Sequence, residues 1–137
     1  MGIRGVLGAL AALILIVCVG CGKENTPVKP KLTTKQLEAF YPGDISKVDH
    51  IEIRSGSTGE LRVYTDQKVV QDWIEKVRHI PMIPDPNQEG KVGYLFAVGL
   101  FEGKEKKLGF SSTDIADHYY LHSKELAKQI SDLFTSK

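Results

Sequence analysis

Two histidines and a tyrosine recur at every second position near the C-terminus, where such residues could hold a metal ion. His118, Tyr120 and His122 would share one face of a β-strand, because side chains alternate along a strand. The two histidines would then be about 13 Å apart, whereas zinc ligands each lie about 2.1 Å from the ion. Since Tyr119 and Leu121 also favour a strand, we expect a half-exposed edge strand here and no metal site.

A glycine-rich segment and two acidic pairs are weaker candidates for a binding or catalytic site. Residues 55–59 (Ser-Gly-Ser-Thr-Gly) could bind an anion through backbone N–H groups. They lack the Gly-Lys-Ser/Thr ending of a phosphate-binding loop, so we interpret them as a hairpin loop. Asp44 with Asp49, or Asp85 with Glu89, could perform acid–base catalysis, but chance pairs are expected at this acidic content. We therefore predict a protein that is not an enzyme and that has no cofactor.

The loop from Pro81 to Gly93 is the strongest candidate for a binding surface. Thirteen residues without regular structure are unusual in a small domain and often carry function. Its three prolines would lower the entropic cost of ordering the loop on a partner. We assign the candidate contacts to Met82, Ile83, Asp85 and Tyr94. The alternative is that Met82 and Ile83 simply pack under the loop.

The first twenty-two residues have the pattern of a targeting segment and contain both cysteines. Arg4 precedes an uncharged apolar run from Gly5 to Gly20. As a helix this run would be about 24 Å long, which is short for a hydrocarbon core of about 30 Å. The pattern is typical of a secretory signal. An uncleaved anchor is the alternative, and the lysines after the run would then favour a cytoplasmic location for the remainder.

The end of this run, Cys18-Val19-Gly20-Cys21, places a small residue directly before a cysteine. It resembles the lipobox of bacterial lipoprotein precursors, although Leu is more usual at the position of Cys18. The resemblance implies that lipoprotein-processing enzymes cleave after Gly20 and attach lipid to Cys21. It further implies that acyl chains on Cys21 hold the protein in the lipid bilayer, on the outer face of the bacterial cytoplasmic membrane.

The composition indicates one folded domain. The chain has 137 residues, of which 42% are hydrophobic and 26% charged, as in globular proteins. Its 18 basic and 17 acidic residues argue against a nucleic-acid partner. We divide the chain into a signal peptide (1–20), a lipidated cysteine with a basic tether (21–36) and one domain (37–137).

Hydrophobic periodicity in the last segment predicts an α+β fold. The expected order is ββα-βββα, an antiparallel sheet of about five strands with two amphipathic helices on one face. A Thr-x-x-Gln capping box at 33–36 also predicts a short helix before the sheet. The expected elements are a hairpin of strands 50–54 and 61–65, a helix capped by Asp66, strands at 94–101, 106–111 and 118–122, and a helix capped by Ser123.

Residues 47–59, with Gly93–Phe96 and Tyr119-Tyr120, look similar to small, mostly uncharacterised lipoproteins of Gram-positive bacteria. This resemblance implies no particular activity. We therefore hypothesise a membrane-tethered, non-catalytic binding or accessory module. Its partner would be another envelope protein, or a peptide added along a sheet edge. One alternative is an inhibitor that presents the 81–93 loop to an extracellular hydrolase, and another is a hydrolase with an unrecognised site.

Overall fold

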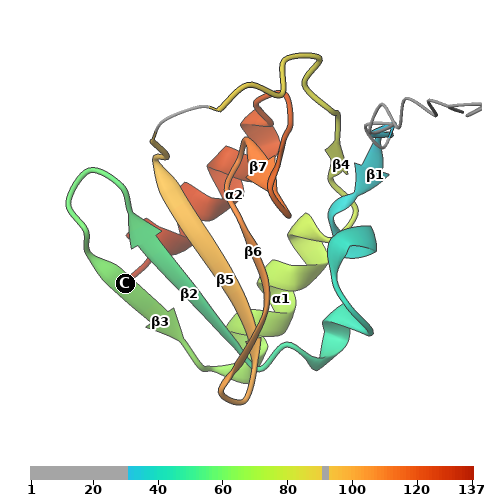
Figure 1. Ribbon diagram of the computed structural model, residues 1–137. Helices are drawn as coiled ribbons and strands as arrows, with labels where there is room; N and C mark the ends of the chain where they lie inside the picture. The colour runs from blue at the N-terminus through green and yellow to red at the C-terminus, as the bar shows by residue number, and fades with distance from the viewer. Residues whose placement is uncertain (1–30, 91–92) are drawn as a thin grey trace, which may run out of the picture. The chain divides into compact units, whose positions relative to one another are not determined.

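The computed structural model describes residues 31–90 and 93–137 (Figure 1). The predicted signal peptide, Gly20 and Cys21 lie outside these residues. The elements are β1 (Lys35–Gln36), the 3-10 turns η1 (Leu37–Phe40) and η2 (Ile45–Lys47), β2 (His50–Ser55), β3 (Leu61–Tyr64), α1 (Gln67–Val77), β4 (Pro81–Met82), β5 (Phe96–Glu102), β6 (Glu105–Phe110), β7 (Asp114–Ile115), β8 (His118–Tyr119) and α2 (Lys124–Thr135).

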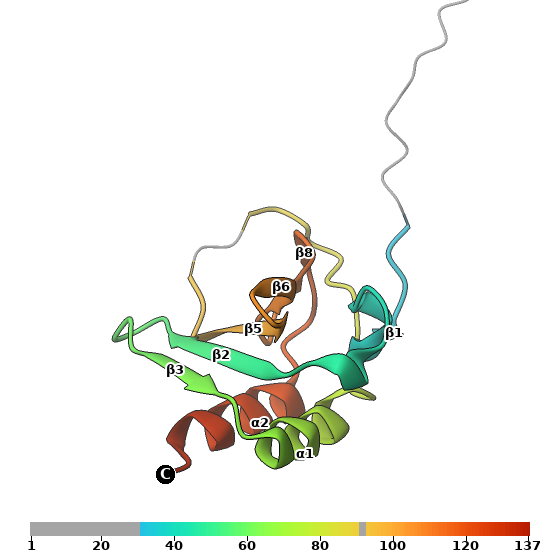
Figure 2. The same cartoon turned by 90° about the horizontal axis from the view of Figure 1, so that it is seen from below.

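Six antiparallel strands form the main sheet in the order β3-β2-β5-β6-β7-β8, and β1 pairs with β4 in a separate two-stranded sheet. Figure 2 shows α1 and α2 together on one face of the main sheet. The α+β class is confirmed, but the expected number of about five strands is too low. Strands β1, β4, β7 and β8 are each two residues long. Such short strands show no period-two pattern in the sequence.

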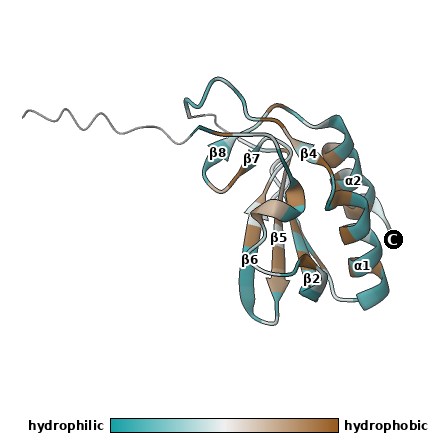
Figure 3. Ribbon diagram, turned by 90° about the vertical axis from the view of Figure 1, so that its right-hand side faces the viewer, coloured by the Kyte–Doolittle hydropathy of each residue, from teal (hydrophilic) through white to brown (hydrophobic). Residues whose placement is uncertain are grey.

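The core fills the space between the sheet and the two helices. Alternate side chains of β2 and β5 point toward the helices and are buried, and the apolar stripes of the helices meet them (Figure 3). The Trp73 indole N–H donates to the Gln129 carbonyl at 3.0 Å, which joins the two helices. The buried residues of this layer include Ile51, Ile53, Val70, Trp73, Ile74, Val77, Val98, Leu100, Leu126, Ile130 and Leu133.

Side-chain caps begin both helices where the sequence predicts them. The Asp66 carboxylate accepts from the Val69 N–H, and the Ser123 hydroxyl accepts from the Leu126 N–H. Neither helix is long and apolar enough to cross a bilayer, among the residues that the structure describes.

The predicted capping box at 33–36 is wrong. The expected short helix is the 3-10 turn η1, and its first residues receive no side-chain cap. Instead, the N–H groups of Leu37 and Glu38 donate to the carbonyls of Ile80 and Arg78. Because a distant part of the backbone already accepts from these N–H groups, a capping side chain is not needed.

The turn between β5 and β6 depends on the carboxylate of Asp49. It accepts from the Gly103 N–H at 2.6 Å and lies 2.9 Å from Nδ1 of His50. The His50 ring in turn stacks on Phe101, with ring centroids 4.4 Å apart. Asp49 therefore links the start of β2 to the turn between β5 and β6. The hydrogen bond from Gly103, followed by that from His50, lowers the pKa of Asp49.

We expect Asp49→Asn to reduce the loss of stability in acid. A lowered folded-state pKa stabilises the fold above the unfolded-state pKa of about 3.9, and this contribution disappears as the pH falls through the folded-state pKa. The asparagine oxygen can still accept from Gly103 but does not titrate. Urea unfolding at about pH 7 and about pH 3 should show a smaller loss of unfolding free energy for the variant. Equal losses would contradict this role of Asp49.

Candidate functional site

The loop predicted between Pro81 and Gly93 is partly regular. Pro81 and Met82 form β4 and pair with Gln36 and Lys35 of β1. The expectation of thirteen residues without regular structure is therefore wrong at the start of the loop. The partner strand lies far back in the chain and is only two residues long, so no local pattern could predict the pairing.

The four candidate contact residues of this loop differ in accessibility. Met82 is completely buried, whereas Ile83 is 48% exposed and Tyr94 is 45% exposed. The alternative that both Met82 and Ile83 pack under the loop is thus right only for Met82. Asp85 is held within the loop, because its carboxylate accepts from the Asn87 N–H at 2.9 Å. Ile83 and Tyr94 remain able to contact another molecule.

Gln88 fastens the loop to the outer edge of β8. Its Nε2 donates to the carbonyls of Tyr119 and Asp85, each at 2.7 Å, and its Oε1 accepts from the Tyr119 N–H at 2.9 Å. The loop backbone pairs with this edge as well, because the Asp85 N–H donates to the Tyr119 carbonyl at 3.0 Å and Pro84 forms a bridge with Tyr120. Further along, the Leu121 N–H donates to the Ile83 carbonyl at 2.8 Å. The loop therefore covers this edge of the sheet.

Strand β3 forms the opposite edge, and its inward side chains fix it to the end of α2. Arg62 donates from Nη1 to the Phe134 carbonyl, and its guanidinium lies 4.7 Å from the centre of the Phe134 ring. The Tyr64 hydroxyl donates to the Leu133 carbonyl at 2.7 Å. Burial raises the pKa of Tyr64, so its hydroxyl keeps the proton that it donates. The edge strand is therefore held in a defined position.

The outward backbone of β3 has no strand beside it among the described residues. The Ser55 N–H donates to the Glu60 carbonyl, which identifies this pair as hydrogen-bonded. In an antiparallel ladder every second pair is hydrogen-bonded, so the backbone groups of Arg62 and Tyr64 bond to β2. The N–H and C=O groups of Leu61 and Val63 consequently point outward. Their side chains are 42% and 50% exposed.

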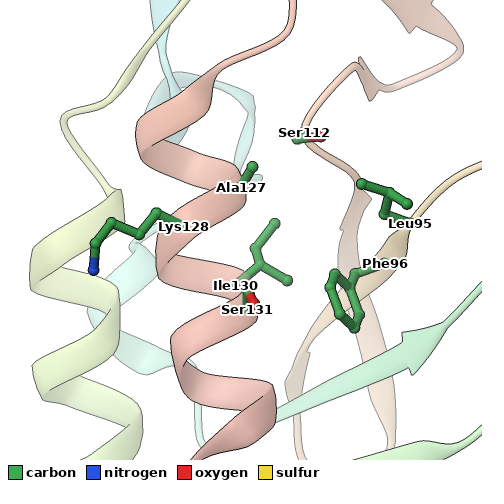
Figure 4. Close-up of a pocket in the computed structure, with 7 residues that line it drawn as sticks. All are labelled: Leu95, Phe96, Ser112, Ala127, Lys128, Ile130 and Ser131. Atoms are coloured by element: carbon green, nitrogen blue, oxygen red, sulfur yellow. The ribbon is translucent and has the colours of Figure 1, made fainter.

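An apolar hollow of about 290 Å³ lies between the start of β5 and α2. Figure 4 shows Leu95 and Phe96 on one side, facing Ala127 and Ile130 on the other. Lys128 points away from this hollow, and its ammonium pairs with Asp132. The walls are therefore mainly hydrocarbon, with the hydroxyls of Ser112 and Ser131 beside them, and they suit an apolar group.

The histidines near the C-terminus do not share one regular strand. Strand β8 ends at Tyr119; beyond it the Tyr120 N–H donates to the Thr113 carbonyl, and the Leu121 N–H donates to the Ile83 carbonyl of the loop. Tyr120 is buried, and its ring packs edge-on against Phe40 at 5.5 Å. His118 contacts a nearby backbone carbonyl at 2.8 Å. Within residues 31–90 and 93–137, no three potential metal-binding side chains come together.

The first acidic pair and the glycine-rich segment both support the local fold. The Asp44 carboxylate accepts from the Ser46 N–H and begins η2, while Asp49 holds the β5–β6 turn. In the hairpin loop, the Gly56 N–H donates to the Leu95 carbonyl at 2.8 Å. A Cβ at Gly56 would lie 1.9 Å from the Tyr94 carbonyl oxygen, so only glycine permits this approach.

No protein family, curated protein or solved structure matches this chain. Two features of its own geometry define the candidate site, namely the open edge of β3 and the apolar surface around Leu95. The sequence predicted peptide addition at an unspecified sheet edge and named Ile83 and Tyr94 as contacts, but it pointed neither to β3 nor to Leu95. The apolar residues Leu61 and Val63 at alternate positions indicate a strand, but they do not indicate that this strand ends the sheet.

The neighbours Met82 and Ile83 provide a matched test of how the loop is held. We expect Met82→Ala to lower the free energy of unfolding by about 2–5 kcal/mol, because it removes a fully buried side chain. Ile83→Ala should cost less than about 1 kcal/mol, because that side chain is half-exposed. Denaturant titration of both variants measures the difference. Similar losses would show that the two residues are not packed as described.

Proposed function

We propose that this protein is a lipid-anchored, non-catalytic binding module on the outer face of a bacterial cytoplasmic membrane. Cleavage after Gly20 and acylation of Cys21 would attach it to the bilayer. Its partner is an extended segment of another envelope protein, which adds to the sheet along β3. The open edge of β3, opposite an edge that the loop covers, is the observation that supports this proposal.

An added strand gains affinity from main-chain hydrogen bonds, and alternate side chains give selectivity. The outward N–H and C=O groups of Leu61 and Val63 supply the hydrogen bonds. Because β3 is already fixed to α2, it loses little freedom when a partner binds. A shallow hollow of about 240 Å³ beside Leu61, lined also by Glu52, Arg54 and Lys106, can receive side chains of the added segment.

The alternative of a hydrolase inhibitor has less support. An inhibitory loop presents its anchors to the enzyme, but Met82 is in the core and Gln88 is engaged with β8. Replacing residues 82–89 with a Gly/Ser linker would therefore damage the fold as well as any contact. The loop has a structural role that accounts for its prolines and polar residues.

The proposed lipid anchor predicts the mass of the mature protein, which depends on acylation of the Cys21 sulfur. The membrane-extracted protein should lack residues 1–20 and carry acyl chains on Cys21. Cys21→Ser should abolish acylation, and globomycin should leave the signal peptide attached. Intact-mass spectrometry distinguishes these forms. A native polypeptide that still begins at Met1 and has no acyl chains would contradict the anchor.

The β3 edge predicts a site-specific crosslink. A photoreactive p-benzoylphenylalanine at Leu61 of the full-length protein should crosslink in cells to a defined envelope protein. Adding Val63→Pro should abolish the crosslink, because proline removes an outward N–H from an edge strand while leaving the bonds to β2. The yield of the adduct on denaturing gels measures the effect.

Two controls separate recognition from chance contact. Val63→Thr keeps the outward N–H and should retain the crosslink. The photoreactive residue at Val69, a similarly exposed apolar position on α1, should give no adduct of the same mass. A crosslink from both positions, or one that survives Val63→Pro in a folded variant, would contradict strand addition at β3.

A further inference from the structure

One end of the domain exposes a group of large apolar side chains, which we call the apolar end. It consists of Ile83, Tyr94, Leu95 and Leu121, and Leu95 is the most exposed of them at 69%. These are four of the seven large hydrophobic residues that are exposed in the described chain. The other three are the two outward residues of β3 and Val69 on α1.

The four residues of the apolar end form two pairs, each of neighbouring residues. The Leu121 N–H donates to the Ile83 carbonyl, so these two residues are neighbours. Tyr94 and Leu95 line one hollow with His122, which directly follows Leu121. The apolar hollow against α2 adjoins Leu95. Figures 1 and 3 place this region at the end of the sheet opposite the β5–β6 turn.

The chain that leads to Cys21 leaves the domain beside this surface. Lys35 of β1 pairs with Met82 of β4, and Ile83 follows Met82 directly. Nine residues separate Cys21 from Lys31, the first described residue, and the ten Cα–Cα steps can span at most about 35 Å. That reach is similar to the diameter of a domain of this size, for which the radius of gyration is about 13 Å. A tether of this length lets any face of the domain reach the bilayer, so the preference for the apolar end comes from its exposed apolar side chains.

We propose that the apolar end rests on the bilayer to which the chain is anchored, with its four side chains in the boundary between headgroups and acyl chains. This inference rests on the proposed lipidation of Cys21. A short tether makes the second contact intramolecular and therefore effective even when it is weak. Combining a lipid chain with a second surface contact gives stable attachment.

Apolar contact provides this second attachment, because the exposed charges nearby have both signs, with Lys31 and Lys35 where the chain enters the domain and Glu89 in the loop. Glu89 lies exposed in the same loop and would oppose an anionic surface. Tyrosine suits a membrane interface because its ring is apolar and its hydroxyl is polar. In this orientation β3 lies along the side of the domain, so its open edge stays accessible to a partner (Figure 1).

Coupling the chain chemically to a vesicle tests the orientation independently of native lipidation. In residues 21–137 the sole cysteine is Cys21, so it can be attached to a maleimide lipid in phosphatidylcholine vesicles. The described domain has its own core within this piece. Tryptophan introduced as Leu95→Trp should be quenched by lipids brominated on their acyl chains. The matched control is Lys104→Trp, which lies in the β5–β6 turn at the opposite end.

We expect the bromolipid to reduce the Leu95→Trp emission at least twofold more than that of Lys104→Trp, after subtraction of the Trp73 signal. Adding Ile83→Ser and Leu121→Ser should remove most of this difference. Near-UV circular dichroism checks that each variant is folded. Equal quenching at the two ends would overturn the orientation, whatever the native state of Cys21. The mass of the native protein separately decides whether the anchor itself is correct.

Discussion

The two edges of a β-sheet carry backbone N–H and C=O groups that need partners, and this requirement organises the molecule. At β8 the requirement is met within the chain, because the Gln88 amide bonds to both polar groups of the Tyr119 backbone. Met82, near the start of the same loop, is buried in the core. Covering one edge thus uses the loop that sequence analysis assigned to binding. The other edge, β3, has no such cover in the described chain.

The open edge is held in place by the residues that face inward from it. Arg62 and Tyr64 both donate to carbonyls at the end of α2. These two hydrogen bonds also cap the last turn of that helix. The position of β3 therefore depends on the packing of α2 against the sheet. A core substitution under α2, such as at Ile130, would disturb the edge without touching it. The stability of the core and the position of β3 are coupled through these two hydrogen bonds.

Sequence patterns predicted the elements that carry their own signals. Helices α1 and α2 combine a side-chain cap with an apolar stripe of several turns, and the β2–β3 hairpin alternates around a glycine-rich loop. These features are local, so spacing alone reveals them. The central position of β5 also follows from its apolar character on both faces.

The remaining features depend on contacts between distant residues. Strands β1, β4, β7 and β8 exist because a neighbouring backbone meets each of them, and two residues show no periodicity. Met82 and Ile83 are adjacent in the sequence and both are apolar. The pairing of β4 with β1 determines which of them is buried. Similarly, nothing in the residues of β3 indicates that it ends the sheet. Strand order is a property of the whole chain.

Two apolar surfaces remain exposed in a domain that otherwise buries its large side chains well. Exposed apolar groups and open edges favour association, and proteins commonly reduce both. In this domain a loop covers β8, whereas β3 and the apolar end are uncovered. The two surfaces adjoin at one point, because Leu61 of β3 and Tyr94 of the apolar end line the same hollow. A bilayer at one surface and an extended chain at the other would cover each with a partner suited to its chemistry: hydrocarbon against side chains, and backbone against backbone.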